Sequence, residues 1–181
     1  MSNLTTPSPS PDRWRPLRVA FAATAALVLG GCASMQDIPP GTPLAEVQAR
    51  HGAPTLSCPL PDGSRNLVWS SQPMGQYAWS TQVTPDGKVG VIEQILTDAA
   101  FRRVETGVWD EDRLRCTFGP PADISTVGMP SVRQTVWSYR YRQDGVWNSL
   151  MYVYLSDDGI VQRLHPGPDP LYETREWPFF F

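Results

Sequence analysis

Side chains suited to metal binding or nucleophilic catalysis are few in this sequence. It contains two histidines, His51 and His165, and three cysteines. His51, Cys58, Cys116 and His165 lack the ligand spacing of a standard zinc site. No HExxH, P-loop, GxGxxG or GxSxG motif is present. We therefore predict no enzyme activity, no metal and no cofactor.

The N-terminal segment is typical of an export signal. Arg13, Arg15 and Arg18 precede an uncharged, largely apolar run from Val19 to Gly31. A spanning helix needs about 20 apolar residues, so this run is short for one. A basic region, a short apolar region and small residues before a cleavage site describe a secretory signal. A short membrane anchor is the alternative.

The end of that run, Leu29-Gly30-Gly31-Cys32, resembles the lipobox of bacterial lipoproteins. The resemblance implies cleavage after a signal peptide, residues 1–31, and lipidation of Cys32 with palmitate-type acyl chains. Two or three acyl chains would hold the protein on a membrane almost permanently. Ala33 follows the cysteine. The absence of an Asp there resembles lipoproteins of the outer membrane.

Composition limits the remaining classes of function. After cleavage about 150 residues remain, which is enough for one ordinary domain or two small ones. The formal net charge of the whole chain is −3, and the charges are scattered. Without a basic block, we predict that nucleic acid is not a partner.

Cys58 and Cys116 are the two cysteines left after lipidation. Disulfides persist in exported proteins, so a bond between these two is possible. Closing so long a loop would stabilise the fold by about 4 kcal/mol in the chain-entropy model. The alternative is two buried free thiols in separate structural units.

Two parts of the chain resemble each other, which indicates a domain duplication. The segment Leu44–Thr55 is similar to Glu111–Ala122, and later landmarks follow in the same order. The matched residues are Gly52 and Gly119, Pro54 and Pro121, Trp69 and Trp137, and Gly87 and Gly159. Chance similarity is the alternative. We predict a tether at 32–40, repeats at 41–96 and 97–165, and a Pro/aromatic tail at 166–181.

Local signals predict the helices. Leu44, Val47 and His51 share a helical face, and Gly52 suits the C-terminal stop. Thr97 or Asp98 can cap a helix over 99–105. Asp110 can cap another that carries Leu114.

Alternation and turn dipeptides predict the strands. Hairpin turns are expected at Asp62-Gly63, Asp86-Gly87, Asp144-Gly145 and Asp158-Gly159. This turn chemistry explains the aspartates without a catalytic role. Trp137, Tyr139 and Tyr141 share one strand face, and Val89, Val91, Glu93 and Ile95 share another. We predict an α+β fold: a tandem repeat of a helix pair on an antiparallel sheet of three or four strands.

The order helix, Gly-x-Pro, Trp strand and Asp-Gly hairpin, on a lipobox protein, resembles the SmpA/OmlA family of small outer-membrane assembly lipoproteins. It also looks like the wider fold that includes the beta-lactamase inhibitory protein, which has two such units. The resemblance covers roughly residues 41–165. It implies a non-catalytic accessory role in inserting β-barrels. The second unit and the prolines in the first helix region depart from the SmpA/OmlA pattern.

One strand, Val146–Ser156, is apolar on both faces. Trp147, Met151, Val153 and Leu155 are expected to pack under helices. The opposite face defines a candidate partner surface, composed of Leu150, Tyr152, Tyr154, Arg140 and Arg142. Tyr and Arg are enriched in interface hot spots, and an uncovered apolar patch favours a partner. Burial against the first unit or the tail is the alternative. Trp177 and Phe179–Phe181 in the tail are expected to pack on the domains, a partner or the membrane.

The sequence thus predicts a lipoprotein anchored through Cys32 in the outer membrane and facing the periplasm. Its predicted function is binding of envelope proteins as a scaffold or accessory, with the barrel-assembly machinery as a candidate partner. An inhibitor-like binder of an envelope hydrolase and an enzyme with an unrecognised site are the alternatives.

Overall fold

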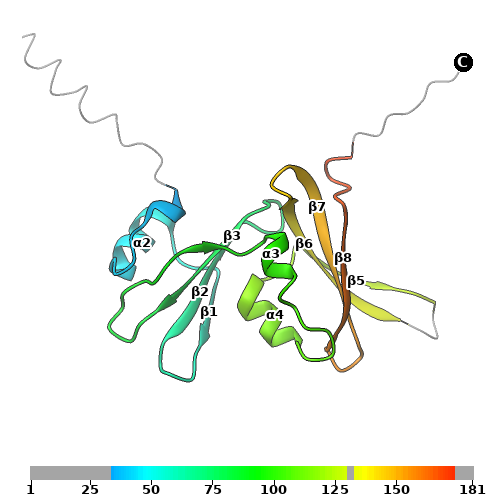
Figure 1. Ribbon diagram of the computed structural model, residues 1–181, viewed down its shortest axis with the longest axis horizontal. Helices are drawn as coiled ribbons and strands as arrows, with labels where there is room; N and C mark the ends of the chain where they lie inside the picture. Colours follow the sequence, from blue (N-terminus) through cyan, green and yellow to red (C-terminus); the bar gives the residue numbers. More distant parts are fainter. Residues whose placement is uncertain (1–33, 130–132, 174–181) are drawn as a thin grey trace, which may run out of the picture. The chain divides into compact units, whose positions relative to one another are not determined.

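The computed structural model describes residues 34–129 and 133–173, and the part from Met35 onward forms one compact unit. The fold is α+β, with two antiparallel four-stranded sheets whose strands follow the chain order (Figure 1). The first sheet contains β1 (Leu56–Pro59), β2 (Arg65–Ser70), β3 (Ala78–Val83) and β4 (Glu93–Gln94). The second contains β5 (Asp123–Val127), β6 (Gln134–Gln143), β7 (Trp147–Leu155) and β8 (Val161–Pro168).

The helices are short, and their ends follow the predicted signals. They are the 3-10 helix η1 (Met35–Asp37), α2 (Leu44–His51), α3 (Asp98–Phe101) and α4 (Glu111–Phe118). Thr97 caps α3 by accepting a hydrogen bond from the Ala100 amide at 3.1 Å. Asp110 caps α4 in the same way, with the Arg113 amide at 2.8 Å. The four expected Asp-Gly turns are confirmed, since all four glycines have positive φ.

The first core lies between α2 and one face of the first sheet. Val47 of α2 is fully buried there with Leu67 and Trp69 of β2. Met35 and Ile38 belong to the same core. The segment predicted as a tether is therefore part of the fold from Met35 onward, because two of its apolar side chains are buried.

The second core is shared by the two sheets. Phe118 of α4 stacks on Phe101 of α3, with ring centroids 4.7 Å apart. The other face of the first sheet contributes Val68 and Ala78 to this core. The second sheet contributes Trp137, Tyr139, Tyr141, Met151, Val153 and Leu155. The predicted inward face of the second sheet is confirmed for these residues. Helix α4 therefore shares one hydrophobic core with residues of both sheets.

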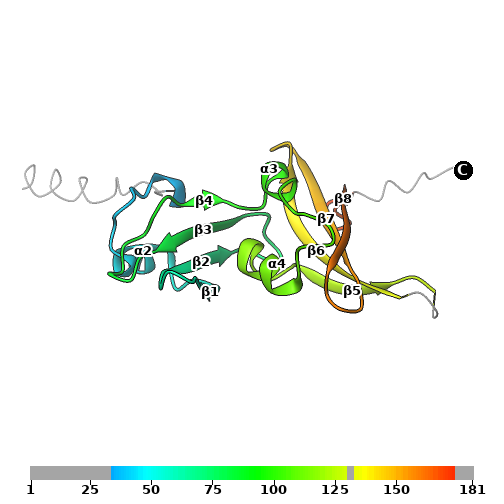
Figure 2. The same ribbon diagram turned by 60° about the horizontal axis from the view of Figure 1, so that its bottom comes forward.

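Helix α4 is also bonded to the first sheet, and it contacts β1 and β2 (Figures 1 and 2). Cys58 of β1 and Cys116 of α4 form a disulfide, with Cα atoms 5.8 Å apart. The side chain of Asn66 donates to the Cys116 carbonyl at 2.7 Å. At the end of the helix, a Cβ on Gly119 would lie 3.0 Å from Val68 Cγ1. This close approach needs a glycine.

Three expectations about the elements are wrong. The first half has one α-helix and a 3-10 turn, so the predicted pair of helices is absent there among the described residues. The helix expected over 99–105 ends at Phe101, because the chain must turn for the Gly107 amide to reach the Val161 carbonyl at 2.7 Å. The strand expected over Val89–Ile95 is reduced to β4, and Val91 is 64% exposed.

Candidate functional site

The predicted partner surface lies on the outer face of β6 and β7, where Arg140 pairs with Leu150. The chain itself covers part of it. Leu150 is buried, and the Arg140 Nε donates to the Asp169 carboxylate at 2.6 Å. Asp169 follows β8 at the start of the predicted tail, and its side chain is fully buried. The surface is therefore smaller than expected, because Leu150 and Arg140 bind residues of their own chain.

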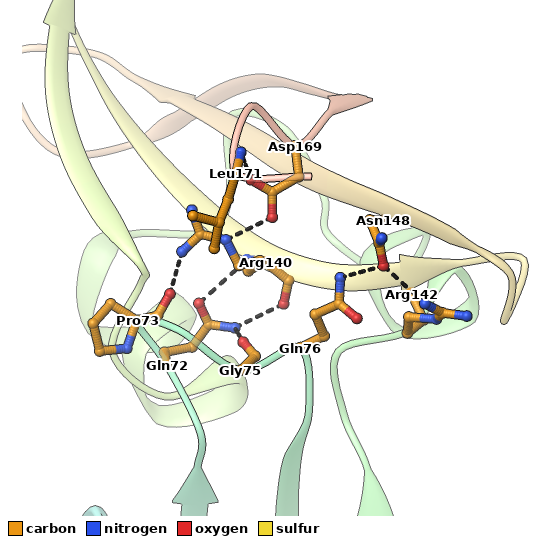
Figure 3. A network of polar contacts seen from close by, with 9 residues as sticks. All are labelled: Gln72, Pro73, Gly75, Gln76, Arg140, Arg142, Asn148, Asp169 and Leu171. Carbon is orange, nitrogen blue, oxygen red and sulfur yellow. Dashed lines mark hydrogen bonds and ion pairs between the residues drawn. The ribbon is translucent and has the colours of Figure 1, made fainter. Parts of the chain in front are cut away.

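The loop after β2 makes further contacts with the second sheet (Figure 3). The Gln72 side chain donates to the Arg140 carbonyl at 2.7 Å and accepts from the Arg140 amide at 3.3 Å. Arg140 also donates to the carbonyl of Pro73. The Gln76 amide donates to Asn148 Oδ1 at 2.8 Å, and Arg142 donates to the same oxygen. These polar contacts join the two halves of the fold.

Tyr152 and Tyr154 remain half-buried on that outer face. The guanidinium of Arg163 lies 3.7 Å from the Tyr154 ring centroid, and His165 contacts both tyrosines. Trp147 is 67% exposed, so the prediction that it packs under a helix is wrong. It is the first residue of β7, directly after the hairpin turn and beyond the helices.

A larger concave site is formed by residues of both halves of the fold. It is a groove of 830 Å³ between the polar face of the first sheet and the α3–α4 segment. The sheet contributes Asn66, Ser80 and Gln82. The opposite wall contains Arg102, Arg103, Trp109, Arg113 and the disulfide of Cys58 and Cys116. We refer to this site as the arginine groove.

Hydrogen bonds hold the floor of the arginine groove in place. Ser80 Oγ donates to Asn66 Oδ1 at 2.8 Å, and Asn66 donates onward to α4. The guanidinium of Arg113 lies 4.3 Å from the Trp109 ring centroid. Trp109 is 6% exposed, and its indole N–H has no hydrogen-bond partner among the described residues. The wall thus presents cations to the groove.

The arginine groove holds no recognisable catalytic arrangement among the described residues. Its two carboxylates, Glu93 and Glu105, are exposed, and neither histidine lines it. The described part of the chain contains no cluster of His, Cys, Asp or Glu that could hold a metal ion. The groups with strongly shifted pKa values are Tyr139 and Tyr141, whose burial raises the pKa of each phenol. Both belong to the core.

No pattern in the sequence alone predicts the arginine groove. The polar positions Ser80 and Gln82 were visible as one face of a strand. The adjacent arginines, Arg102 and Arg103, were visible as a pair. Nothing in the sequence indicated that the α3–α4 segment, which follows the first sheet, packs back onto it.

The predictions for Cys32, Trp177 and Phe179–Phe181 concern residues outside the described part of the chain. Within the described part, no helix has both the length and the apolar character needed to cross a membrane.

Comparison with known proteins gives little further information. No model of a protein family matches the chain, and no curated protein matches it. Among solved structures it is similar to a DUF4309 family protein (YjgB) from Bacillus subtilis subsp. subtilis str. 168. The identity is 16%, the match covers 76% of this chain and 85% of that one, and the TM-score is 0.29.

Proposed function

We propose that this protein is a lipid-anchored envelope protein that binds another protein in the arginine groove and catalyses no reaction. Its anchor is the lipid on Cys32, its membrane is the outer membrane, and its folded part faces the periplasm. The lipobox-like end of the N-terminal segment supports the anchor. The single observation that carries the binding role is the open 830 Å³ groove lined by three arginines.

We further propose that the two halves arose by duplication. Support comes from two equivalent bonds, one at the C-terminal end of α2 and one at the C-terminal end of α4. The Trp69 indole donates to the Gly52 carbonyl at 2.9 Å, and the Tyr139 hydroxyl donates to the Gly119 carbonyl at 3.3 Å. These bonds match Trp69 with Tyr139 and not with Trp137 as the sequence suggested. The longer β5–β6 connection shifts the match.

Other backbone hydrogen bonds recur in the same order, which is unusual for unrelated segments of a chain. The amides of Thr55 and Ala122 bond to the carbonyls of Val68 and Ser138, each at 2.7 Å. The amides of Gly41 and Gly107 bond to the carbonyls of Val89 and Val161, each at 2.7 Å. Isolated bridges join Pro43 to Lys88 and Asp110 to Ile160. Such a duplicated unit fits the proposed kinship with SmpA/OmlA-like lipoproteins and with the tandem inhibitor fold.

A role as an accessory in outer-membrane protein assembly follows from that kinship, and the partner would then be a barrel-assembly subunit. The second candidate is inhibition of an envelope hydrolase. It rests on the two units and the groove they share with α4, because a concave surface at the junction of two units can receive a loop of an enzyme.

Two experiments test the proposal. Cells producing the full chain are labelled with an alkyne fatty acid, and wild type is compared with Cys32→Ser. We expect label only in the wild type. Equal labelling of both proteins would contradict a lipid anchor on Cys32.

In the second experiment a photoreactive residue replaces Gln82 in the arginine groove or Arg163 on the second sheet. Crosslinked products from intact envelopes are identified by mass spectrometry. We expect a protein adduct at Gln82 and not at Arg163. Barrel-assembly subunits would favour the first role and a hydrolase the second. No adduct at Gln82 would contradict protein binding in the groove.

A further inference from the structure

We propose that the occupant of the arginine groove is an extended, acidic segment of the partner protein, with its carboxylates held by Arg102, Arg103 and Arg113. This inference rests on the protein-binding role proposed above and adds the chemistry of the partner.

The charge of the arginine groove favours an acidic ligand. Two other arginines of the fold are engaged in ion pairs, Arg50 with Glu46 and Arg140 with Asp169. Arg102 and Arg103 have no side-chain hydrogen bond or ion pair with any described residue, although both line the groove. Guanidinium groups outnumber carboxylates there, three to two. A groove with excess unpaired guanidinium groups favours an anionic ligand, because a carboxylate can accept two parallel hydrogen bonds from each.

Polar side chains of the sheet in the groove can bond a peptide main chain. The Asn66 amide and the Ser80 hydroxyl already donate within the protein. Ser80 can therefore offer its lone pairs, and the exposed amide of Gln82 can donate and accept. A peptide main chain supplies both groups along its length.

The shape of the arginine groove favours an extended ligand. A second hollow, of 320 Å³, adjoins the groove and shares Asn66, Ser80, Gln82, Glu93 and Ile95 with it. It continues along the sheet to Gly90 and Val91. Because the two adjoining hollows together form a long polar surface on the sheet, an elongated ligand fits them better than a compact anion does.

The test uses the full lipidated chain, purified in detergent, and a fluorescein-labelled hexaglutamate peptide as the probe. Binding is measured by fluorescence anisotropy at low and at physiological salt. We expect saturable binding that weakens with salt. We expect no binding of a matched hexalysine peptide.

The variant R102E/R103E/R113E should lower the affinity for hexaglutamate at least about tenfold, since several charge contacts are reversed. The matched control R65E/R133E/R163E makes the same change in net charge at exposed positions outside the groove. It should retain more than half of the wild-type affinity. Both variants are first checked for an unfolding midpoint equal to that of the wild type. If the triple variant is unfolded, the single variant Q82A is used instead to test hexaglutamate binding in the groove.

Three results would overturn the proposal. They are the absence of hexaglutamate binding, an equal loss in the control variant, and equally tight binding of linear polyphosphate, which would indicate a site for any polyanion. A protein crosslinked through Gln82 despite a failed hexaglutamate assay would reject only the acidic segment. The absence of any crosslinked protein would instead reject the proposed function. A fourth result would also overturn the proposal: self-association that is lost in R102E/R103E/R113E would assign the groove to a second copy.

Discussion

The two sheets have the same strand order but different neighbours. The first sheet has α2 on one face and α4 on the other, so both of its faces contribute to a hydrophobic core. The second sheet has helices on its inner face only, and its outer face is partly covered by Asp169 and by the loop that carries Gln72. The two sheets therefore differ in the surfaces that they leave uncovered. The first retains a polar groove, and the second retains two half-buried tyrosines.

The difference shows that a strand's alternation determines which residues share a face but not what covers that face. Ser80 and Tyr152 occupy corresponding positions on the outer faces of β3 and β7. Ser80 lines a groove because α4 covers only part of the first sheet. Tyr152 instead packs beside His165, and a Cβ on Gly167 would lie 2.9 Å from its ring.

The largest expected effect comes from removing the link between α4 and the first sheet. The disulfide joins residues 58 positions apart. In the chain-entropy model, C58S/C116S should lower the free energy of unfolding by about 4 kcal/mol. Urea denaturation monitored by tryptophan fluorescence measures the loss. A loss below about 1 kcal/mol would mean that the packing around Phe118 holds α4 in place without the bond.

The next effect concerns the buried pair that covers the second sheet. Asp169→Ala leaves Arg140, whose side chain is 16% exposed, without its carboxylate. Breaking a largely buried pair should cost about 3 kcal/mol of unfolding free energy. The control is Glu46→Ala, which breaks a pair whose side chains are 48% and 56% exposed. That change should cost less than about 0.5 kcal/mol. Equal losses in the two variants would show that Asp169 adds nothing through its burial.

A matched pair of glycine variants compares the two helix ends directly. Gly52 and Gly119 have nearly the same backbone, with φ of 80° and 79°. Alanine at either position should lower the free energy of unfolding by about 1–3 kcal/mol, because a residue with a Cβ is strained at this positive φ. Gly119→Ala should cost about 1 kcal/mol more, since its Cβ would also crowd Val68. Thermal unfolding of the two variants measures the difference, and a larger loss for Gly52→Ala would contradict the close packing of α4 on β2.

The smallest effect comes from the hydrogen bond at the C-terminal end of α4. Tyr139→Phe keeps the ring stack and removes the bond to the Gly119 carbonyl. We expect a loss of about 1 kcal/mol in the free energy of unfolding. Chemical denaturation at pH 7 provides the measurement. An unchanged or increased stability would show that this hydrogen bond does not stabilise the fold.

The same variant has a pH dependence with a defined sign. Burial raises the pKa of Tyr139 and of Tyr141, so the folded state keeps both phenols protonated. Their contribution is fully present below the ordinary phenol pKa of about 10 and is lost as the pH rises above it. Tyr139→Phe should therefore flatten the fall in stability between about pH 10 and pH 11. An identical fall in both proteins would argue against burial of that phenol.

Local structure was largely predictable because short-range chemistry determines it. The caps at Thr97 and Asp110, the Asp-Gly turns, the inward face of β6 and the end of α2 at Gly52 all follow from neighbouring residues. The reduced strand β4 and the short α3 could not be predicted, since contacts with distant segments override local preference. The Gly107–Val161 hydrogen bond is one such contact.

The sequence by itself determined the helix caps, the Asp-Gly turns and the residues that share each strand face. These depend on order along the chain, on turn chemistry and on a period of two residues in strands. Only the tertiary structure decided that α4 lies against both sheets, that Asp169 neutralises Arg140, and that three arginines line one groove. The physical reason is that burial and pairing depend on segments far apart in the sequence, and side-chain volume and charge select them only once the chain has folded.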